Sequence, residues 1–176
     1  MSRVFRLFAL CILLTFGSNC LAITQGRIIG VLDGDTVDLL TDSKELIRIR
    51  LAGIDAPEKA QSFGNFAKKV LSDLAYNRAV VVEGAKHDRY GRLVGKVLLN
   101  GGDVNIEMVR RGLAWHYTKY KREQSPDDRV QYEKAEEAAR LQRLGLWRDA
   151  HPIAPWDFRK RSRGSAVAAQ RQSALN

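Results

Sequence analysis

Cysteine and histidine are scarce in this chain of 176 residues, and their scarcity removes several classes of site. The two cysteines, Cys11 and Cys20, both lie near the N-terminus, so the remainder of the chain has neither a thiol nor a disulfide. The histidines, of which there are three, are scattered, and no His/Cys spacing of a zinc site is present. A glycine-rich phosphate loop and a plausible Ser-His-Asp set are also lacking.

Long apolar runs are lacking as well, except near the N-terminus. Two arginines precede an apolar run over residues 7–16, and small and polar residues follow it. This pattern is typical of a secretory signal peptide, and the run is too short for a comfortable membrane span. We therefore expect residues 1–22 to be a signal peptide, with no membrane segment after its cleavage and a secreted or periplasmic mature protein. A lipoprotein signal that uses Cys20 is the alternative, which the preceding Asn19 disfavours.

Acidic residues are outnumbered by basic ones. The chain has 29 Lys and Arg against 20 Asp and Glu, a formal net charge of +9 that favours a polyanionic partner, best matched by nucleic acid. Part of the surplus lies in residues 159–176, a basic tail rich in Ser, Ala and Gln that we predict to be disordered. The alternative is that the charge of this tail serves solubility alone. We expect residues 23–158 to form one domain and the protein to be a monomer.

The hydrophobic pattern predicts five short strands. Alternation and β-prone runs place them at residues 26–32, 36–40, 46–54, 79–82 and 93–99. Short strands of this number, with one helix among them and further helices behind them, are typical of an OB-type barrel. The sequence therefore predicts an α+β fold that is mainly β: a five-stranded OB-type Greek-key barrel with three α-helices.

The three predicted helices differ in how clearly their ends are marked. The first is indicated by apolar residues at helical spacing over residues 67–74. The second begins at an Asp103 cap and extends to Gly112. The third begins at a capping box over residues 125–128, with proline at the first helical position, and we expect it to end at Gly145.

Three short blocks of acidic and basic residues lie at the ends of predicted strands. Residues 33–36 read Asp-Gly-Asp-Thr, residues 50–58 begin with Arg and end with Asp-Ala-Pro-Glu, and residues 88–92 read Asp-Arg-Tyr-Gly-Arg. Carboxylates can hold a hard divalent cation, and a further carboxylate can take a proton from water. Guanidinium groups can neutralise a phosphate whose charge grows in the transition state. Together the blocks hold what metal-assisted hydrolysis of a phosphodiester needs.

The three blocks, their order and the plan of strands and helices resemble the staphylococcal nuclease (thermonuclease) family over about residues 24–147. The resemblance implies calcium as the cofactor, with three protein ligands: the carboxylates of Asp35 and Asp55 and the backbone carbonyl of Ala56. It also implies three catalytic residues: Arg50 and Arg92, which bind phosphate, and Glu58, the general base.

Aromatic residues are the second part of the resemblance. Tyr90 and Tyr120 resemble residues that hold the terminal phosphate or stack near the nucleotide. A family tyrosine aligns with Thr118, and a shift of one residue would let Tyr117 take its place. We expect Trp115 to pack in the protein and Tyr120 to be exposed.

Some candidates in these blocks also have plainer interpretations. An Asp-Gly-Asp sequence between strands commonly forms only a turn, and we expect this role for Asp33. Alternation puts Arg48 and Arg50 on the same strand face, so only the spacing to Asp55 selects Arg50 as the phosphate ligand. We expect Arg89 to be an exposed loop cation.

The resemblance implies a secreted, calcium-dependent phosphodiesterase, an endonuclease that hydrolyses DNA and RNA with little sequence preference and leaves 3′-phosphates. Single-stranded or unpaired regions are the favoured substrates. The alternative is a catalytically inactive OB-fold module that binds nucleic acid. A pure binder has no need of Asp35, Asp55 and Glu58, whose charge repels phosphate without a cation, and their presence favours the enzyme.

Overall fold

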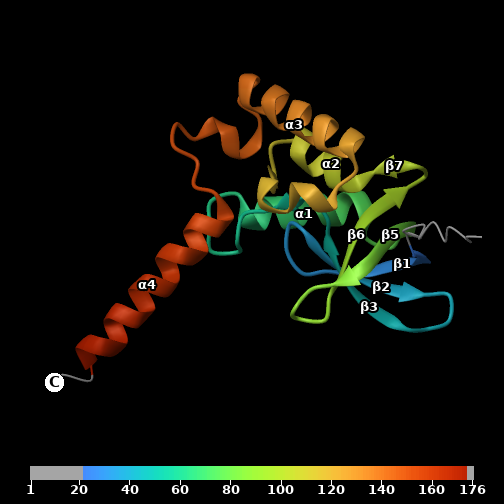
Figure 1. Ribbon diagram of the computed structural model, residues 1–176, viewed down its shortest axis with the longest axis horizontal. Coiled ribbons are helices and arrows are strands. Elements are labelled where there is room, and N and C mark those ends of the chain that lie inside the picture. The colour runs from blue at the N-terminus through green and yellow to red at the C-terminus, as the bar shows by residue number, and fades with distance from the viewer. Residues whose placement is uncertain (1–21, 174–176) are drawn as a thin grey trace, which may run out of the picture.

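A closed β-barrel forms the centre of the structure, a computed structural model that describes residues 22–173 (Figure 1). β1 (Ile23–Val31), β2 (Thr36–Thr41) and β3 (Leu46–Leu51) form an antiparallel meander. β5 (Ala79–His87) pairs with the other side of β1, and β6 (Leu93–Leu99) pairs with β5. A parallel pairing of β3 with β6 closes the barrel. The predicted five-stranded OB-type barrel is therefore confirmed.

The predicted strand over residues 46–54 is broken in two. Gly53 has a φ of 74°, in the left-handed region that glycine adopts without strain, and the chain turns there out of the barrel. The short β4 (Ile54–Asp55) that follows pairs instead with β8 (Trp115–His116). Another two-residue strand, β7 (Gly102–Asp103), extends the sheet beside β6. The break after β3 therefore carries Asp55 away from the barrel wall and toward the segment around Trp115.

Strands β1 and β5 both extend beyond their predicted ends. The added residues of β1 pair with β5, where Ile23 lies opposite Glu83, and the added Lys86 and His87 of β5 pair with β6. Residues in mutual pairing need no strong alternation of their own, because the backbone hydrogen bonds of the partner strand hold them. The strands predicted from the hydrophobic pattern therefore lack the first residues of β1 and the last residues of β5.

Helices α1 (Gly64–Ala75) and α2 (Val104–Arg110) lie against the barrel, and α3 (Pro126–Leu141) lies on α2 (Figure 1). Helix α1 follows the second block and packs against β1, whereas α2 and α3 pack against each other. A 3₁₀ helix, η1 (Thr118–Glu123), precedes α3. These helices agree with the three that the sequence predicts.

The predicted caps begin α2 and α3. Asp103 accepts a hydrogen bond from the backbone N–H of Ile106 at 3.1 Å, and Ser125 accepts one from the N–H of Asp128 at 3.1 Å. Each cap satisfies a helix N–H that has no partner within the helix.

The end of α3 differs from the prediction, because the helix stops at Leu141 and not at Gly145. Arg143 has a φ of 51°, which interrupts the helical backbone, and Gly145 instead begins the 3₁₀ helix η2 (Gly145–Arg148). Gly145 therefore does mark a turn of the chain, but α3 has already ended at the earlier turn around Arg143.

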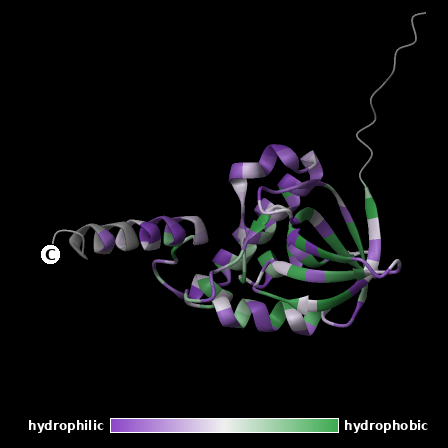
Figure 2. Cartoon of the chain, turned by 90° about the horizontal axis from the view of Figure 1, so that it is seen from below, coloured by the Kyte–Doolittle hydropathy of each residue, from purple (hydrophilic) through white to green (hydrophobic). Residues whose placement is uncertain are grey.

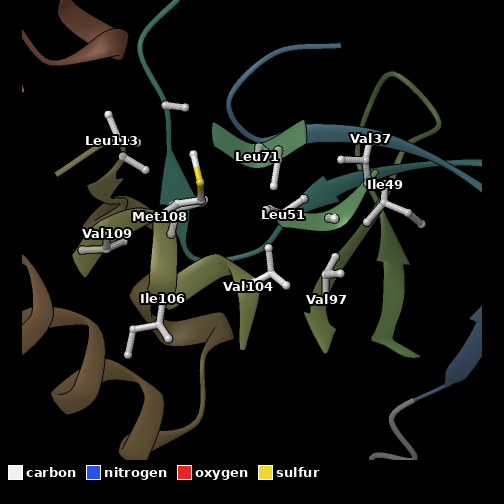
Figure 3. Close-up of a cluster of buried hydrophobic side chains, with 14 of the residues drawn as sticks. Val37, Ile49, Leu51, Leu71, Val97, Val104, Ile106, Met108, Val109 and Leu113 are labelled. Carbon is white, nitrogen blue, oxygen red and sulfur yellow. The ribbon is translucent and has the colours of Figure 1, made fainter. Parts of the chain in front are cut away.

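The barrel interior and the underside of the helices share one apolar core, part of which is drawn in Figure 3. Its members are almost fully buried and come from both layers: Val37, Ile49, Leu51 and Val97 from the strands, Leu71 from α1, and Val104, Met108 and Val109 from α2. Burying each of these side chains is worth about 1.5–3 kcal/mol. Because strand side chains alternate, the burial of Ile49 and Leu51 directs Arg50 to the other side of the wall.

The predicted disorder of residues 159–176 is wrong for the part that the structure describes. These residues continue α4 (Pro155–Ser173), a fourth helix that points away from the barrel (Figure 1). Pro155 suits a first helical turn, and the Ala, Arg, Lys and Gln residues that made the composition look disordered are also good helix formers. The low hydrophobicity of this segment correctly predicts that it is exposed to solvent. It does not predict that the segment forms a helix.

Two further predictions concern membranes and secretion. The predicted signal peptide over residues 1–22 lies almost entirely outside the described residues, so it stays a prediction. Within residues 22–173, no helix combines the length and the apolar character that a membrane span requires.

Candidate active site

The turn before β2 places the first carboxylate of the site. Asp33 accepts a hydrogen bond from the backbone N–H of Asp35 at 3.0 Å, which is the turn role expected for it. Gly34 between them lies so close to Ala56 and Ala67 that an added Cβ would be 2.7 and 2.8 Å from their Cβ atoms. Glycine is therefore required at this position for the turn to approach α1 and the segment after β4.

Two buried carboxylates meet on a single guanidinium group. Arg50 Nη2 lies 3.0 Å from Asp35 Oδ2 and 2.8 Å from Asp55 Oδ1. Asp35 is 6% exposed and Asp55 is 1% exposed. Arg50 Nη1 also donates to the carbonyls of Leu51 and Ile54, at 2.8 and 2.9 Å, which fixes the side chain across the break between β3 and β4. The structure thus brings together three of the predicted site residues from two blocks.

Backbone and hydroxyl groups orient the Asp35 carboxylate. The N–H of Ala56 donates to Asp35 Oδ2 at 2.7 Å, and the Thr36 hydroxyl donates to Oδ1 at 3.1 Å. Ala56 is therefore next to Asp35 through its backbone, although the role of its carbonyl as a ligand stays a prediction. Both the hydrogen bond of the Ala56 N–H and the expected ligand role of its carbonyl use the backbone, so neither needs a side chain larger than alanine at position 56.

The charge of Asp35 is costly in this position. Burial raises its pKa from 3.8 to about 7; the Arg50 guanidinium opposes this rise, whereas the carboxylates of Asp33 and Asp55 add to it. A divalent cation bound between Asp35 and Asp55 would stabilise the ionised form of both. Carboxylate and carbonyl oxygens are the ligands that calcium prefers, so the donor set fits this ion better than zinc.

The described residues do not supply a complete metal cage. No group of three or more His, Cys, Asp or Glu side chains converges anywhere in residues 22–173 in a manner that could hold a metal ion. A cation at Asp35 and Asp55 would therefore take its other ligands from the backbone, from water and from the substrate phosphate. Such a shared coordination is ordinary for calcium, which accepts six to eight oxygens.

The raised pKa of Asp35 predicts that stability falls as the pH rises. Between pH 3.8 and about 7 the folded protein holds a proton that the unfolded chain has already lost, so the free energy of unfolding decreases across this window. In the presence of a chelator, Asp35→Asn should gain about 2–4 kcal/mol relative to the wild type between pH 4 and pH 8. Urea unfolding at several pH values measures this difference, with Asp73→Asn, an exposed acid of α1, as the control. A difference that does not vary with pH would contradict the assignment.

Arg92 reaches the same rim of the barrel from the loop between β5 and β6. Its Nε donates to Asp88 Oδ2 at 2.7 Å, and its Nη1 lies 3.4 Å from the Thr36 hydroxyl, which in turn donates to Asp35. Burial alone would raise the pKa of Asp88, but the hydrogen bonds from Arg92 and from the backbone lower it overall. Asp88 thus holds Arg92 in a position where the Thr36 hydroxyl connects it to Asp35.

Tyr90 lies at the outer end of this loop and is 68% exposed. Its ring centroid is 5.4 Å from the Arg92 guanidinium carbon and 4.8 Å from that of Arg89. The tyrosine is therefore accessible beside Arg92, and its proposed contact with substrate stays a prediction. In this loop, the Arg89 side chain donates one hydrogen bond, to the Tyr90 hydroxyl, as expected for an exposed cation.

Glu58 lies on the loop before α1 and is 39% exposed at its side chain. Gln61 holds the start of this loop, because its Oε1 accepts from the Glu58 N–H at 3.2 Å and its Nε2 donates to the Ile153 carbonyl. Glu58 Oε1 itself accepts a hydrogen bond from Arg159 at 2.6 Å. The structure therefore places Glu58 beside Asp55, since the same guanidinium bonds to both carboxylates.

Arg159 is a site residue that sequence reasoning missed. It lies 104 residues after Asp55, in the segment predicted to be disordered, and no local pattern connects the two. Although burial lowers the pKa of Arg159, its hydrogen bonds to Asp55 and Glu58 raise it overall, so the side chain remains charged. The sequence shows the surplus of basic residues in this segment. It does not show that one of them, Arg159, binds Asp55 and Glu58.

Aromatic side chains line one side of the site. Tyr117 lies two residues after Trp115, which pairs with Asp55, and burial together with the charge of Asp55 raises the pKa of the Tyr117 hydroxyl. Tyr120 is exposed, as expected, and lies edge-on to Tyr117 with 5.1 Å between ring centroids. Trp115 packs between Trp147 and Trp156, as the packing interpretation requires. The one-residue shift that favours Tyr117 over Thr118 is consistent with this arrangement.

Comparisons with known proteins agree with the geometry. A family model described as staphylococcal nuclease homologue matches residues 48–149. The chain is 41% identical to a micrococcal nuclease of Shigella flexneri, over 80% of this chain and 83% of that protein. It is 38% identical to Protein ParB of Escherichia coli, over 85% and 86% of the two chains, and 42% identical to an uncharacterized endonuclease of the same species, over 78% and 86%. The matched family region contains Arg50, Asp55, Glu58 and Arg92, whereas Arg159 lies beyond it.

Proposed function

Because the chain belongs to the staphylococcal nuclease homologue family, we propose that it is a calcium-dependent endonuclease that hydrolyses DNA and RNA with little sequence preference. The proposal is carried by one observation, the meeting of Asp35 and Asp55 on Arg50. Glu58 and Arg92 lie within one further contact of this group. A module that only binds nucleic acid would gain nothing from burying two carboxylates beside a phosphate site.

The arginines have the task of binding the scissile phosphate. A guanidinium group presents two parallel N–H donors to phosphate oxygens, which a lysine cannot do. As the phosphorus becomes five-coordinate, negative charge grows on these oxygens, and Arg50 and Arg92 would stabilise that charge. A calcium ion held by Asp35, Asp55 and the Ala56 carbonyl would supply further stabilisation of the same charge.

Glu58 has the task of taking a proton from the attacking water. Its side chain is partly exposed and lies beside Asp55, so a water can reach both Glu58 and a phosphate bound at the rim. Pro57 restricts the backbone immediately before Glu58 and stiffens the loop. By resemblance to the family, the water displaces the 5′ oxygen and the product carries a 3′-phosphate.

The proposed substrate class rests on the part of a nucleic acid that the proposed site residues would contact. The proposed catalytic arginines would contact the phosphate and Glu58 the attacking water, and such contacts carry little information about bases. Tyr90 and Tyr120 are exposed and could stack on unpaired bases, which favours single-stranded regions of DNA or RNA. With the predicted signal peptide, this describes a monomeric enzyme that acts in the periplasm or outside the cell.

An assay of purified mature protein tests the proposal. We expect single-stranded DNA, duplex DNA and RNA to be shortened in the presence of calcium, with 3′-phosphate ends, and cleavage to stop when a chelator is added. Unpaired substrates should be cleaved fastest. Full activity in chelator would contradict the calcium requirement. Binding of nucleic acid with no change in its length would instead support the inactive binding module.

A further inference from the structure

The first two turns of α4 lie directly on the candidate active site. Arg159 Nη2 donates to Asp55 Oδ2 at 2.6 Å, and Arg159 Nη1 donates to Glu58 Oε1 at 2.6 Å and to Asp55 Oδ1 at 3.3 Å. Since Arg50 also donates to Asp55 Oδ1, both oxygens of this carboxylate are bonded to arginine. The guanidinium of Arg159 thus bridges a proposed calcium ligand and the proposed general base.

The same part of α4 covers an aromatic ring beside the carboxylates. Trp156 is stacked on Tyr117, with ring centroids 5.2 Å apart and planes inclined by 10°. This is the geometry in which a nucleobase stacks on a tyrosine. The indole therefore occupies one face of the Tyr117 ring, two residues along the chain from the partner of Asp55 in the β4–β8 pairing.

Residues 160–165 of α4 have little contact with the barrel. Residues 160–165 are exposed, and the helix extends into solvent as a mainly hydrophilic rod (Figures 1 and 2). Its hold on the domain comes from its first residues and from the segment just before it, where Ala154 and Pro155 are buried. A helix attached over so short a length can leave the site without disturbing the core.

We infer that Trp156 and Arg159 form an autoinhibitory strap, in which Arg159 competes with the divalent cation for Asp55 and Glu58 while Trp156 competes with a base for Tyr117. This inference rests on the proposed function. Carboxylate oxygens that accept short hydrogen bonds from a guanidinium group must give up those bonds to coordinate calcium. A Glu58 oxygen bonded to Arg159 is likewise a poor acceptor for a proton from water. Binding of cation and substrate would therefore release the start of α4.

The strap predicts tighter calcium binding when Arg159 is removed. The apparent affinity of a ligand is proportional to the fraction of protein that can accept it, and this fraction is larger without Arg159, so Arg159→Ala should bind calcium about tenfold more tightly than the wild type. Isothermal titration calorimetry of the full mature chain, without nucleic acid, measures this change. Arg161→Ala removes the same charge from the same helix and should bind calcium as the wild type does. Arg159→Lys, which keeps the charge but loses the fork, should lie between.

Amide hydrogen exchange tests the release of the helix separately. In the wild type, calcium should speed exchange over residues 156–163 about tenfold, whereas in Arg159→Ala exchange should be fast with or without calcium. If Arg159→Ala does not fold, Arg159→Lys and the wild-type exchange decide the question.

Four results would overturn the inference. Weaker calcium binding by Arg159→Ala would show that Arg159 supports the cation site. Unchanged binding, or exchange that calcium slows, would show that the contact does not compete. Calcium binding by neither protein would overturn the proposed function as well, so the two failures can be distinguished.

Discussion

Arg92→Ala should lower kcat by about 10³-fold while nucleic acid still binds. Arg92 is held by Asp88 and by contact with Thr36 at the rim of the barrel, where it can reach a phosphate bound near Asp35. Its donors are charged and already oriented, so they stabilise the growing charge of the transition state more than the charge of the bound substrate. Alanine removes this stabilisation and leaves the other cationic contacts to bind the ground state. Single-turnover cleavage of an oligonucleotide at saturating calcium measures the loss.

Arg89→Ala is the matched control for this change. It removes the same charge from the same loop, but Arg89 bonds to the Tyr90 hydroxyl and not to Thr36 or Asp88. Its kcat should stay within about twofold of the wild type, because an exposed cation contributes mainly to nonspecific attraction. Equal losses in the two variants would contradict a specific role for Arg92 and would indicate a general effect of loop charge.

The barrel could be predicted from the sequence because its strands are short, alternate clearly and end in marked turns. The helix caps at Asp103 and Ser125 were equally local signals, and both caps are formed in the structure. The alternation of Ile47, Ile49 and Leu51 indicates a strand, and the break at Gly53 was not predicted, although Ile54 is out of phase with that alternation. Pairing of β4 with β8 overrides that local pattern, and such a long-range pairing cannot be read from spacing.

The candidate site could be predicted only where its residues belong to compact blocks. Alternation left Arg48 and Arg50 equivalent, and the structure separates them, because Arg48 pairs with Asp38 on the surface whereas Arg50 reaches Asp35 and Asp55. Tertiary packing gave each arginine its own partner. Arg159 comes from a segment whose composition predicts disorder, whereas Trp156 lies at the end of the predicted domain. Neither contact with the site had a signal in the sequence.

The most direct test of the account is the binding of calcium by Asp55→Asn. Asp55 is almost completely buried and is the one carboxylate that Arg50 and Arg159 both contact, so an amide there removes a charge central to the site. We expect the calcium affinity, measured by calorimetry, to fall by at least about 100-fold and cleavage at a fixed calcium concentration to fall with it. Asp38→Asn, which removes a carboxylate paired with Arg48 on the surface, should change neither. Wild-type calcium affinity and wild-type cleavage in Asp55→Asn would contradict a cation site at these carboxylates.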